Sequence, residues 1–159
     1  MSTEGLRREL HIGRAMDECM NDLVGEVQTL VDNARIWESR MEEAGVNNVV
    51  AVAQDTGSVE VVKNYIRYQV GRDTRNETWR WRVGGAKSFG ERLVDALDGL
   101  HGRAQAIVSA AWEGEEEPPA GEVGRAWIQL TRSYLGHLKR YFVYRKKMSE
   151  AEQPREARR

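Results

Sequence analysis

The chain has 159 residues, of which 40% are hydrophobic and 31% are charged, a composition that suits one globular domain with an ionic surface. The formal net charge is only −1, yet ten acids face five bases in residues 1–44, whereas residues 125–147 carry seven bases and no acid. This asymmetry favours either docking between copies of the chain or a polyanionic partner on the basic side. No apolar run has the length of a membrane span and no signal-type segment opens the chain, so we expect a cytoplasmic protein that contacts no membrane.

Residues 6–44 carry the strongest helical pattern. Small or apolar residues recur there at steps of three and four, at Leu6, Leu10, Gly13, Met16, Met20, Leu23, Val27, Leu30, Ala34, Trp37, Met41 and Ala44. This near-heptad period predicts one long helix that pairs with another helix. Gly45 is the predicted end of this helix, and Gly13 and Gly25 are positions inside it where it could bend.

The elements after this helix are shorter. Residues 46–54 are valine-rich and are interpreted as a helix, although the same composition permits a strand. Ser58 can cap the next helix, whose apolar face contains Val59, Val62, Ile66 and Val70. Residues 72–85 have no helical period and are predicted to form an ordered loop. Helical periods return at residues 86–112 and 123–148, on either side of an acidic linker at residues 113–121 that we expect to be mobile.

These patterns together predict an all-α protein, a bundle of four to five helices with a long N-terminal helix. Residues 1–148 would form a single helical domain. The polar tail at residues 149–159 would be disordered.

Residues that usually mark a catalytic or metal site are scattered in this sequence. Cys19 is the only cysteine, and His11, His101 and His137 each lack a second histidine at a metal-binding spacing. Neither a phosphate-binding glycine loop nor a nucleophile-elbow motif occurs. We therefore expect no enzyme activity, no catalytic residue, no metal and no cofactor.

Residues 63–87 combine positive charge with aromatic rings. Seven bases against two acids give this stretch a local charge of +5, and Tyr65, Tyr68, Trp79 and Trp81 lie between the bases. Cations hold phosphates and flat rings stack on bases, so the composition suits a nucleic-acid backbone. The alternative is a helix end and a loop whose rings pack into the core. Residues 125–147 form a second basic region, for which the alternative is a terminal helix with a favourable positive end.

The candidate nucleic-acid contacts are cations of both regions, namely Lys63, Arg67, Arg72, Arg75, Arg80, Arg82, Arg132, Lys139 and Arg140. Tyr68, Trp79 and Trp81 are the candidates for stacking on bases. If the two regions face the same way, their cations form a track for phosphates.

Two alternatives remain open. Residues 46–71 resemble a helix-turn-helix DNA reader, with Ala53 and Gly57 between two short helices. Thr56 and Lys63 depart from that motif, since each occupies a position that the motif usually fills with a buried apolar residue. The other alternative is a helical protein–protein interaction module whose long apolar seam pairs with a partner helix.

Residues 64–69, with the sequence NYIRYQ, are followed by Gly71-Arg72 and then by Trp79 and Trp81. In this stretch the chain resembles the small subunits of CRISPR effector complexes, especially those of type III. The resemblance implies a non-catalytic, all-helical subunit that stacks in several copies along an RNA-guided complex. It implies guide RNA or target nucleic acid, other effector-complex subunits and further copies of the chain as partners, and it assigns backbone contacts to Lys63, Arg67, Arg72 and Arg75. The acidic first helix and the linker have no counterpart in this resemblance.

Overall fold

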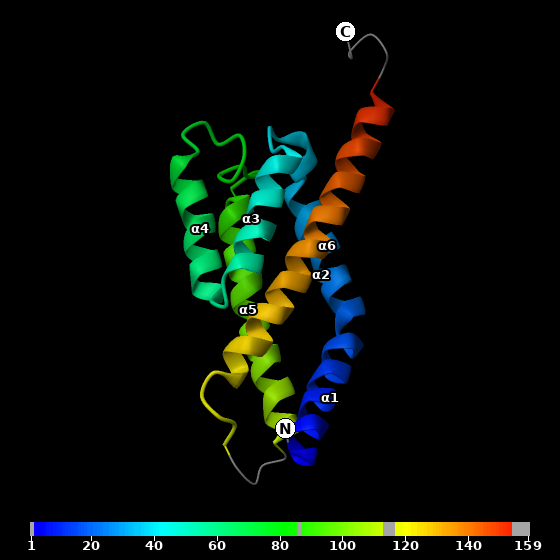
Figure 1. Ribbon diagram of the computed structural model, residues 1–159. Coiled ribbons are helices and arrows are strands. Elements are labelled where there is room, and N and C mark those ends of the chain that lie inside the picture. The colour runs from blue at the N-terminus through cyan, green and yellow to red at the C-terminus, as the bar shows by residue number, and fades with distance from the viewer. Residues whose placement is uncertain (1, 86, 113–116, 154–159) are drawn as a thin grey trace.

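The computed structural model describes residues 2–85, 87–112 and 117–153, and within these ranges its regular elements are all helical (Figure 1). The α-helices of this described part are α1 (Thr3–Glu18), α2 (Met20–Ala34), α3 (Glu43–Asp55), α4 (Val59–Arg72), α5 (Phe89–Ala111) and α6 (Glu122–Glu152). A single 3₁₀ turn, η1 (Ile36–Glu38), lies between α2 and α3. The all-α class is confirmed, while six helices exceed the predicted four to five.

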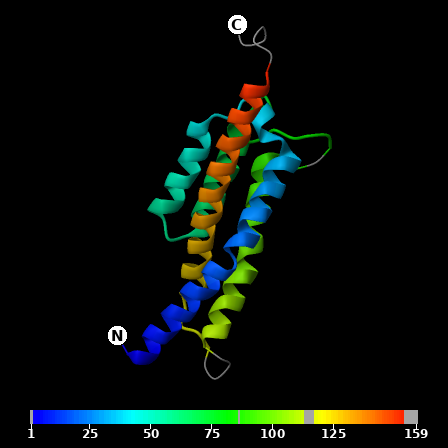
Figure 2. The same cartoon turned by 90° about the vertical axis from the view of Figure 1, so that its right-hand side faces the viewer.

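The helices form an up-and-down bundle around α5 and α6. α6 packs against α5, α2 and α3, and α4 packs against α5 and α3. From α2 to α6 successive helices run in alternating directions, and α1 continues roughly the direction of α2 (Figures 1 and 2). Consequently α1 begins at one end of the bundle and α6 finishes at the other.

The single long helix predicted over residues 6–44 does not form, and its first interruption is at Cys19. The backbone N–H of Cys19 donates to the carbonyl of Met16, only three residues back, at 3.1 Å. The Cys19 thiol donates to the same carbonyl, also at 3.1 Å. This local tightening separates α1, which packs mainly on α5, from α2, which packs mainly on α6. Gly13 and Gly25, the predicted bending positions, lie within the two helices instead.

The second interruption follows α2, where Arg35 adopts a left-handed conformation with φ 50°. A left-handed residue after the last helical turn redirects the chain while its N–H still bonds back into the helix. Ile36 and Met41 then enter the core, and the Ser39 hydroxyl holds the turn by donating to the Ile36 carbonyl and accepting from the Met41 N–H. Gly45, the predicted end of the long helix, therefore lies in the first turn of α3.

The short valine-rich segment is confirmed as a helix, α3, rather than a strand. Ser58 caps α4 as predicted, because its hydroxyl accepts from the Val61 N–H at 3.3 Å. α3 and α4 lie side by side in opposite directions, as an antiparallel helical hairpin (Figure 1). Helix-turn-helix readers instead set their two helices across each other, so this arrangement does not favour the DNA-reader alternative.

The last helix supplies the central row of the core. Its buried residues are Ala126, Ile128, Leu130, Thr131, Tyr134, Leu135, Leu138 and Phe142. The helix extends to Glu152, so residues 149–152 of the predicted disordered tail are helical. Residues 154–159 of that tail and residues 113–116 of the predicted mobile linker lie outside the described residues.

Candidate nucleic-acid interface

The loop between α4 and α5 is organised by the carboxylate of Asp73. Its Oδ1 accepts from the backbone N–H groups of Arg75 and Glu77 at 3.2 and 3.3 Å, and its Oδ2 accepts from those of Thr78 and Arg80, both at 2.9 Å. Burial raises the pKa of Asp73, but the four N–H donors outweigh that effect and the pKa is lowered overall. In the sequence Asp73 stands out only as a charge opposing the bases, but an aspartate directly after a helix is the signal for such a turn.

The same loop turns both of its tryptophans toward the core. Trp79 is only 5% exposed, and its ring centroid lies 5.7 Å from that of Phe89. The indole Nε1 of Trp81 donates to the carbonyl of Ala34, at the end of α2, at 2.9 Å. Backbone N–H groups of Phe89 and Gly90 bond to the carbonyls of Trp81 and Trp79, both at 2.8 Å. The structure thus corrects the expectation that Trp79 and Trp81 stack on bases, because the fold itself uses both rings.

Lys63 is also engaged inside the fold and is only 6% exposed. Its ammonium group lies 2.5 Å from Asp98 and 3.0 Å from Glu60, and 5.6 Å from the ring centre of Trp127. Burial lowers the pKa of Lys63, but its bonds to Asp98 and Glu60 more than offset this, and the pKa is raised overall. The structure therefore removes Lys63 from the phosphate contacts that the resemblance assigned.

Arg132, a candidate nucleic-acid contact on α6, caps another helix. Its Nε donates to the Ala53 carbonyl at 2.8 Å, and one terminal nitrogen donates to the Thr56 carbonyl at 2.9 Å. Both acceptors lie at the end of α3, where helix carbonyls lack intrahelical partners. Arg132 is thus held between α6 and α3 rather than presented to a ligand.

Acids of α6 itself and of other segments each neutralise part of the basic region on α6. Arg145 lies 3.5 Å from Asp32, and Lys146 lies 3.3 Å from Glu42. Arg125 and Lys147 pair with acids on α6 itself, at Glu122 and Glu150. Four of the seven bases of residues 125–147 are therefore paired with acids of the described residues. Only the tertiary contacts could show the pairs of Arg145 and Lys146, because Asp32 and Glu42 are distant from them in sequence.

Lys139 and Arg140 have no ion pair within the described part of the chain, and Arg140 is exposed. They lie on α6, and α3 lies between much of that helix and α4 (Figure 1), although α4 and α6 also contact each other. The exposed residues of α3 include no base: Glu43 and Asp55 at its ends are acidic, and the exposed residues between them are Ala44, Asn47, Asn48, Ala51 and Gln54. The two basic regions therefore do not merge into the continuous phosphate track that would follow if they faced the same way.

Arg67 is exposed but stands beside acids. It lines a groove of about 270 Å³ between α4 and α5, together with Lys87 and the carboxylates of Glu91, Asp95 and Asp98. Lys87 is already paired with Asp95 at 2.8 Å. Asp98 is in turn paired with Lys63, so the groove has no excess of positive charge that would attract a phosphate.

The remaining candidates gather at the end of α4 and on the loop. Arg72, Arg75 and Arg82 are exposed, and Arg80 is half-buried with a terminal nitrogen 3.5 Å from the Gly71 carbonyl. None of these four makes an ion pair within the described residues, where only Asp73 and Glu77 are acidic along this segment. We call these four residues the arginine loop. Beside it, Tyr68 is 60% exposed, and the Arg72 guanidinium lies 5.4 Å from its ring centre.

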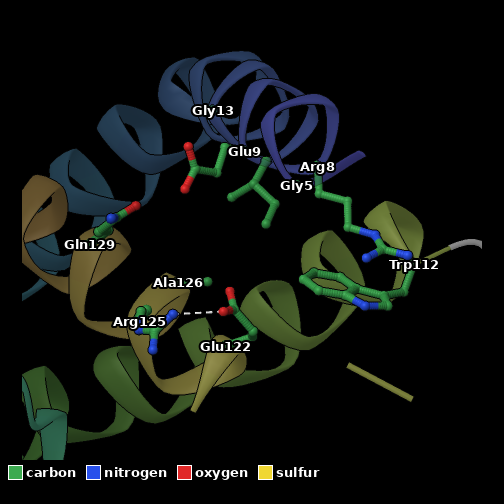
Figure 3. Close-up of a pocket in the computed structure, with 10 residues that line it drawn as sticks. Gly5, Arg8, Glu9, Gly13, Trp112, Glu122, Arg125, Ala126 and Gln129 are labelled. Atoms are coloured by element: carbon green, nitrogen blue, oxygen red, sulfur yellow. Dashed lines mark hydrogen bonds and ion pairs between the residues drawn. The ribbon is translucent and has the colours of Figure 1, made fainter. Parts of the chain in front are cut away.

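A second concave site lies far from the arginine loop, between α1, the end of α5 and the start of α6 (Figure 3). This cleft of about 420 Å³ is lined by Arg8 and Arg125 and by Glu9 and Glu122. Arg8 lies over the ring of Trp112 at 4.7 Å, and Arg125 pairs with Glu122 at 2.6 Å (Figure 3). Equal numbers of acids and bases give the cleft no positive field that would attract phosphates.

Comparison with known proteins adds no assignment. No protein-family model matches the chain, and no curated protein or solved structure matches it. Among the described residues, no three His, Cys, Asp or Glu side chains group in a way that could hold a metal ion. None of the described helices combines the length and the apolar composition of a membrane span. The resemblance to CRISPR small subunits stays a prediction.

Proposed function

We propose that this protein is a non-catalytic RNA-binding subunit of an RNA-guided, CRISPR-type effector ribonucleoprotein. The arginine loop carries the RNA-binding part of this proposal, because its four cations have no ion pair in the described part of the chain. Guanidinium groups suit phosphates since their planar N–H forks can donate two parallel bonds. The assignment to a CRISPR-type complex rests on the resemblance at residues 64–81.

The backbone of the arginine loop is held in place before any ligand arrives. Asp73 accepts from four backbone N–H groups of the segment that carries these arginines, and Trp79 and Trp81 anchor that segment to α5 and α2. A site whose backbone is already ordered loses less conformational entropy on binding. Contacts of this kind read phosphates rather than base edges, so we expect binding that is independent of RNA sequence.

A helical interaction module is the second candidate, and one observation on α1 favours it. Leu6 and Leu10 are 50% and 65% exposed, one helical turn apart. In the proposed complex these leucines would contact a neighbouring subunit. The acids of residues 1–44, whose excess favours docking between copies of the chain, are partly used within one chain, since Glu26 pairs with Arg103 at 2.6 Å and Asp32 pairs with Arg145.

The test is the salt dependence of RNA affinity for the full-length protein. Replacing Arg75 and Arg82 with alanine should weaken binding equally for unrelated RNA sequences. It should also flatten the slope of log affinity against log salt by roughly 0.7 per lost contact on a single strand. The matched control replaces Arg7 and Arg14, two exposed arginines of α1 at the opposite end of the bundle (Figure 1), and should leave both quantities unchanged.

Three results would contradict the proposal. A pure interaction module would bind no RNA in a salt-dependent way. Equal losses of RNA affinity in the arginine-loop variant and the α1 control would mean that binding depends on the overall charge of the protein rather than on this loop. A helix-turn-helix reader would prefer one DNA duplex, with about 1–3 kcal/mol of discrimination per base contact.

A further inference from the structure

We infer that Tyr68 is a stacking platform for one unpaired base, so that the arginine loop takes single-stranded RNA in preference to a duplex. The inference builds on the proposed RNA-binding function and adds the form of the ligand. Stacking was first assigned to three aromatic residues, and the fold leaves one of them facing solvent. Trp79 and Trp81 serve the core, whereas Tyr68 is 60% exposed.

The fold makes little use of the Tyr68 side chain. α4 buries Val59, Val62 and Ile66, and a residue two positions after Ile66 points to the opposite side of the helix. Within the described residues, the ring of Tyr68 pairs with no other aromatic ring and its hydroxyl makes no hydrogen bond. A large ring that contributes nothing to the core is available for a ligand.

Arg72 adds a cation to this platform. Its guanidinium lies 5.4 Å from the centre of the Tyr68 ring, one helical turn further along α4. A base that stacks on Tyr68 would place its own phosphate within reach of such a side chain. An aromatic face beside a cation is the usual arrangement in proteins that bind single strands.

The surrounding charges define the direction in which a bound RNA strand can continue beyond Tyr68. Toward α5, the groove beside Arg67 holds the carboxylates of Glu91, Asp95 and Asp98. Toward the start of α4, the exposed residues are Glu60, Val61 and Asn64, none of them basic. The favourable path for phosphates therefore runs from Tyr68 across Arg72 to the loop.

Base pairing decides between single strand and duplex at this platform. In an RNA duplex both faces of a base are covered by its stacked neighbours, and a protein ring reaches them only where a base is unstacked. The phosphates of a duplex could still contact the arginine loop. Tyr68 should consequently contribute to single-strand affinity and not to duplex affinity.

The experiment compares a short single-stranded RNA with the same strand annealed to its complement, each titrated with full-length protein. Tyr68→Ala should weaken single-strand binding roughly 5- to 150-fold, the range for loss of one stacked base, and leave duplex binding unchanged. Tyr68→Phe should retain affinity because the ring remains. The matched control is Tyr144→Ala, which removes a ring that is 56% exposed on α6 and should change neither affinity.

A second readout reports stacking directly. A purine analogue whose fluorescence is quenched by stacking should lose emission on binding to wild type and to Tyr68→Phe, but not to Tyr68→Ala. Equal losses on single strand and duplex, or a Phe variant as weak as the Ala variant, would overturn the stacking assignment. If Tyr68→Ala is silent while the Arg75/Arg82 variant loses its salt slope, stacking fails and RNA binding stands. If wild type binds neither RNA, both proposals fail.

Discussion

The ammonium group of Lys63 lies 2.5 Å from a carboxylate oxygen of Asp98, and this ion pair joins α4 to α5. The lysine is buried while the Asp98 side chain is about half exposed, so the two partners differ in how much water they lose. We expect Lys63→Met to cost about 1–2 kcal/mol of the free energy of unfolding, less than a fully buried pair, because Asp98 can be rehydrated. Urea unfolding measures this cost, and Lys87→Met, which breaks the exposed pair with Asp95, should change the free energy of unfolding far less, because water already solvates both groups.

The pH dependence of that difference follows from the raised pKa of Lys63. A raised pKa in the folded state means that the ion pair stabilises the protein below the ordinary lysine value of 10.5 and is lost as the pH rises through the higher folded value. The gap between wild type and Lys63→Met should therefore be constant around neutral pH and close only in strongly alkaline solution. A gap that closed near neutral pH would contradict this assignment.

Asp73 should show the opposite dependence. Its pKa is lowered in the folded state, so its contribution is present above the ordinary value of 3.8 and is lost as the pH falls through the lower folded value. Asp73→Asn replaces one acceptor oxygen by a donor, and we expect a loss of about 1–3 kcal/mol at neutral pH that shrinks in strong acid. Urea unfolding at several pH values is the measurement. Asp17→Asn, at an exposed acid of α1, should shift stability by less than about 0.5 kcal/mol.

Two glycines of α5 should respond to alanine in opposite ways. A Cβ atom on Gly90 would lie 2.2 Å from a methyl carbon of Val70 and 3.1 Å from the Trp79 carbonyl oxygen. Gly90→Ala should thus cost about 1–3 kcal/mol. Gly99 has open space around that position, and Gly99→Ala should stabilise the helix by about 0.5–1 kcal/mol. Thermal unfolding of both variants tests the pair, and equal shifts would mean that the loop does not pack against α5 as described.

Trp37 contributes to stability from the 3₁₀ turn and not from a helical seam. Its ring is half-buried, with the Arg145 guanidinium 4.1 Å from its centre. We expect Trp37→Ala to lower the free energy of unfolding by about 1–3 kcal/mol, below the cost of a fully buried tryptophan. Tyr144→Ala, at an exposed ring of α6, serves as control and should change little. An unchanged melting temperature for Trp37→Ala would show that the ring is dispensable to the fold.

The sequence alone determined the helical class and most helix positions. Apolar spacing located α4, α5 and α6, and Ser58 marked the start of α4, because periodicity and capping are local properties. Spacing could not separate α1, α2 and α3. The breaks at Cys19 and Arg35 arise where the chain changes its packing partner, and the apolar spacing of residues 6–44 continues across both.

Which cations are free to meet a ligand was decided by tertiary structure. A lysine or arginine reads the same in sequence whether it faces water or a distant carboxylate. Folding brings Asp98 to Lys63, Asp32 to Arg145 and the end of α3 to Arg132, and leaves Arg72, Arg75 and Arg82 without such partners in the described residues. Composition could indicate that residues 63–87 are basic and aromatic. Only long-range packing could assign Trp79 and Trp81 to the core and Tyr68 to the surface, because burial depends on which helices meet.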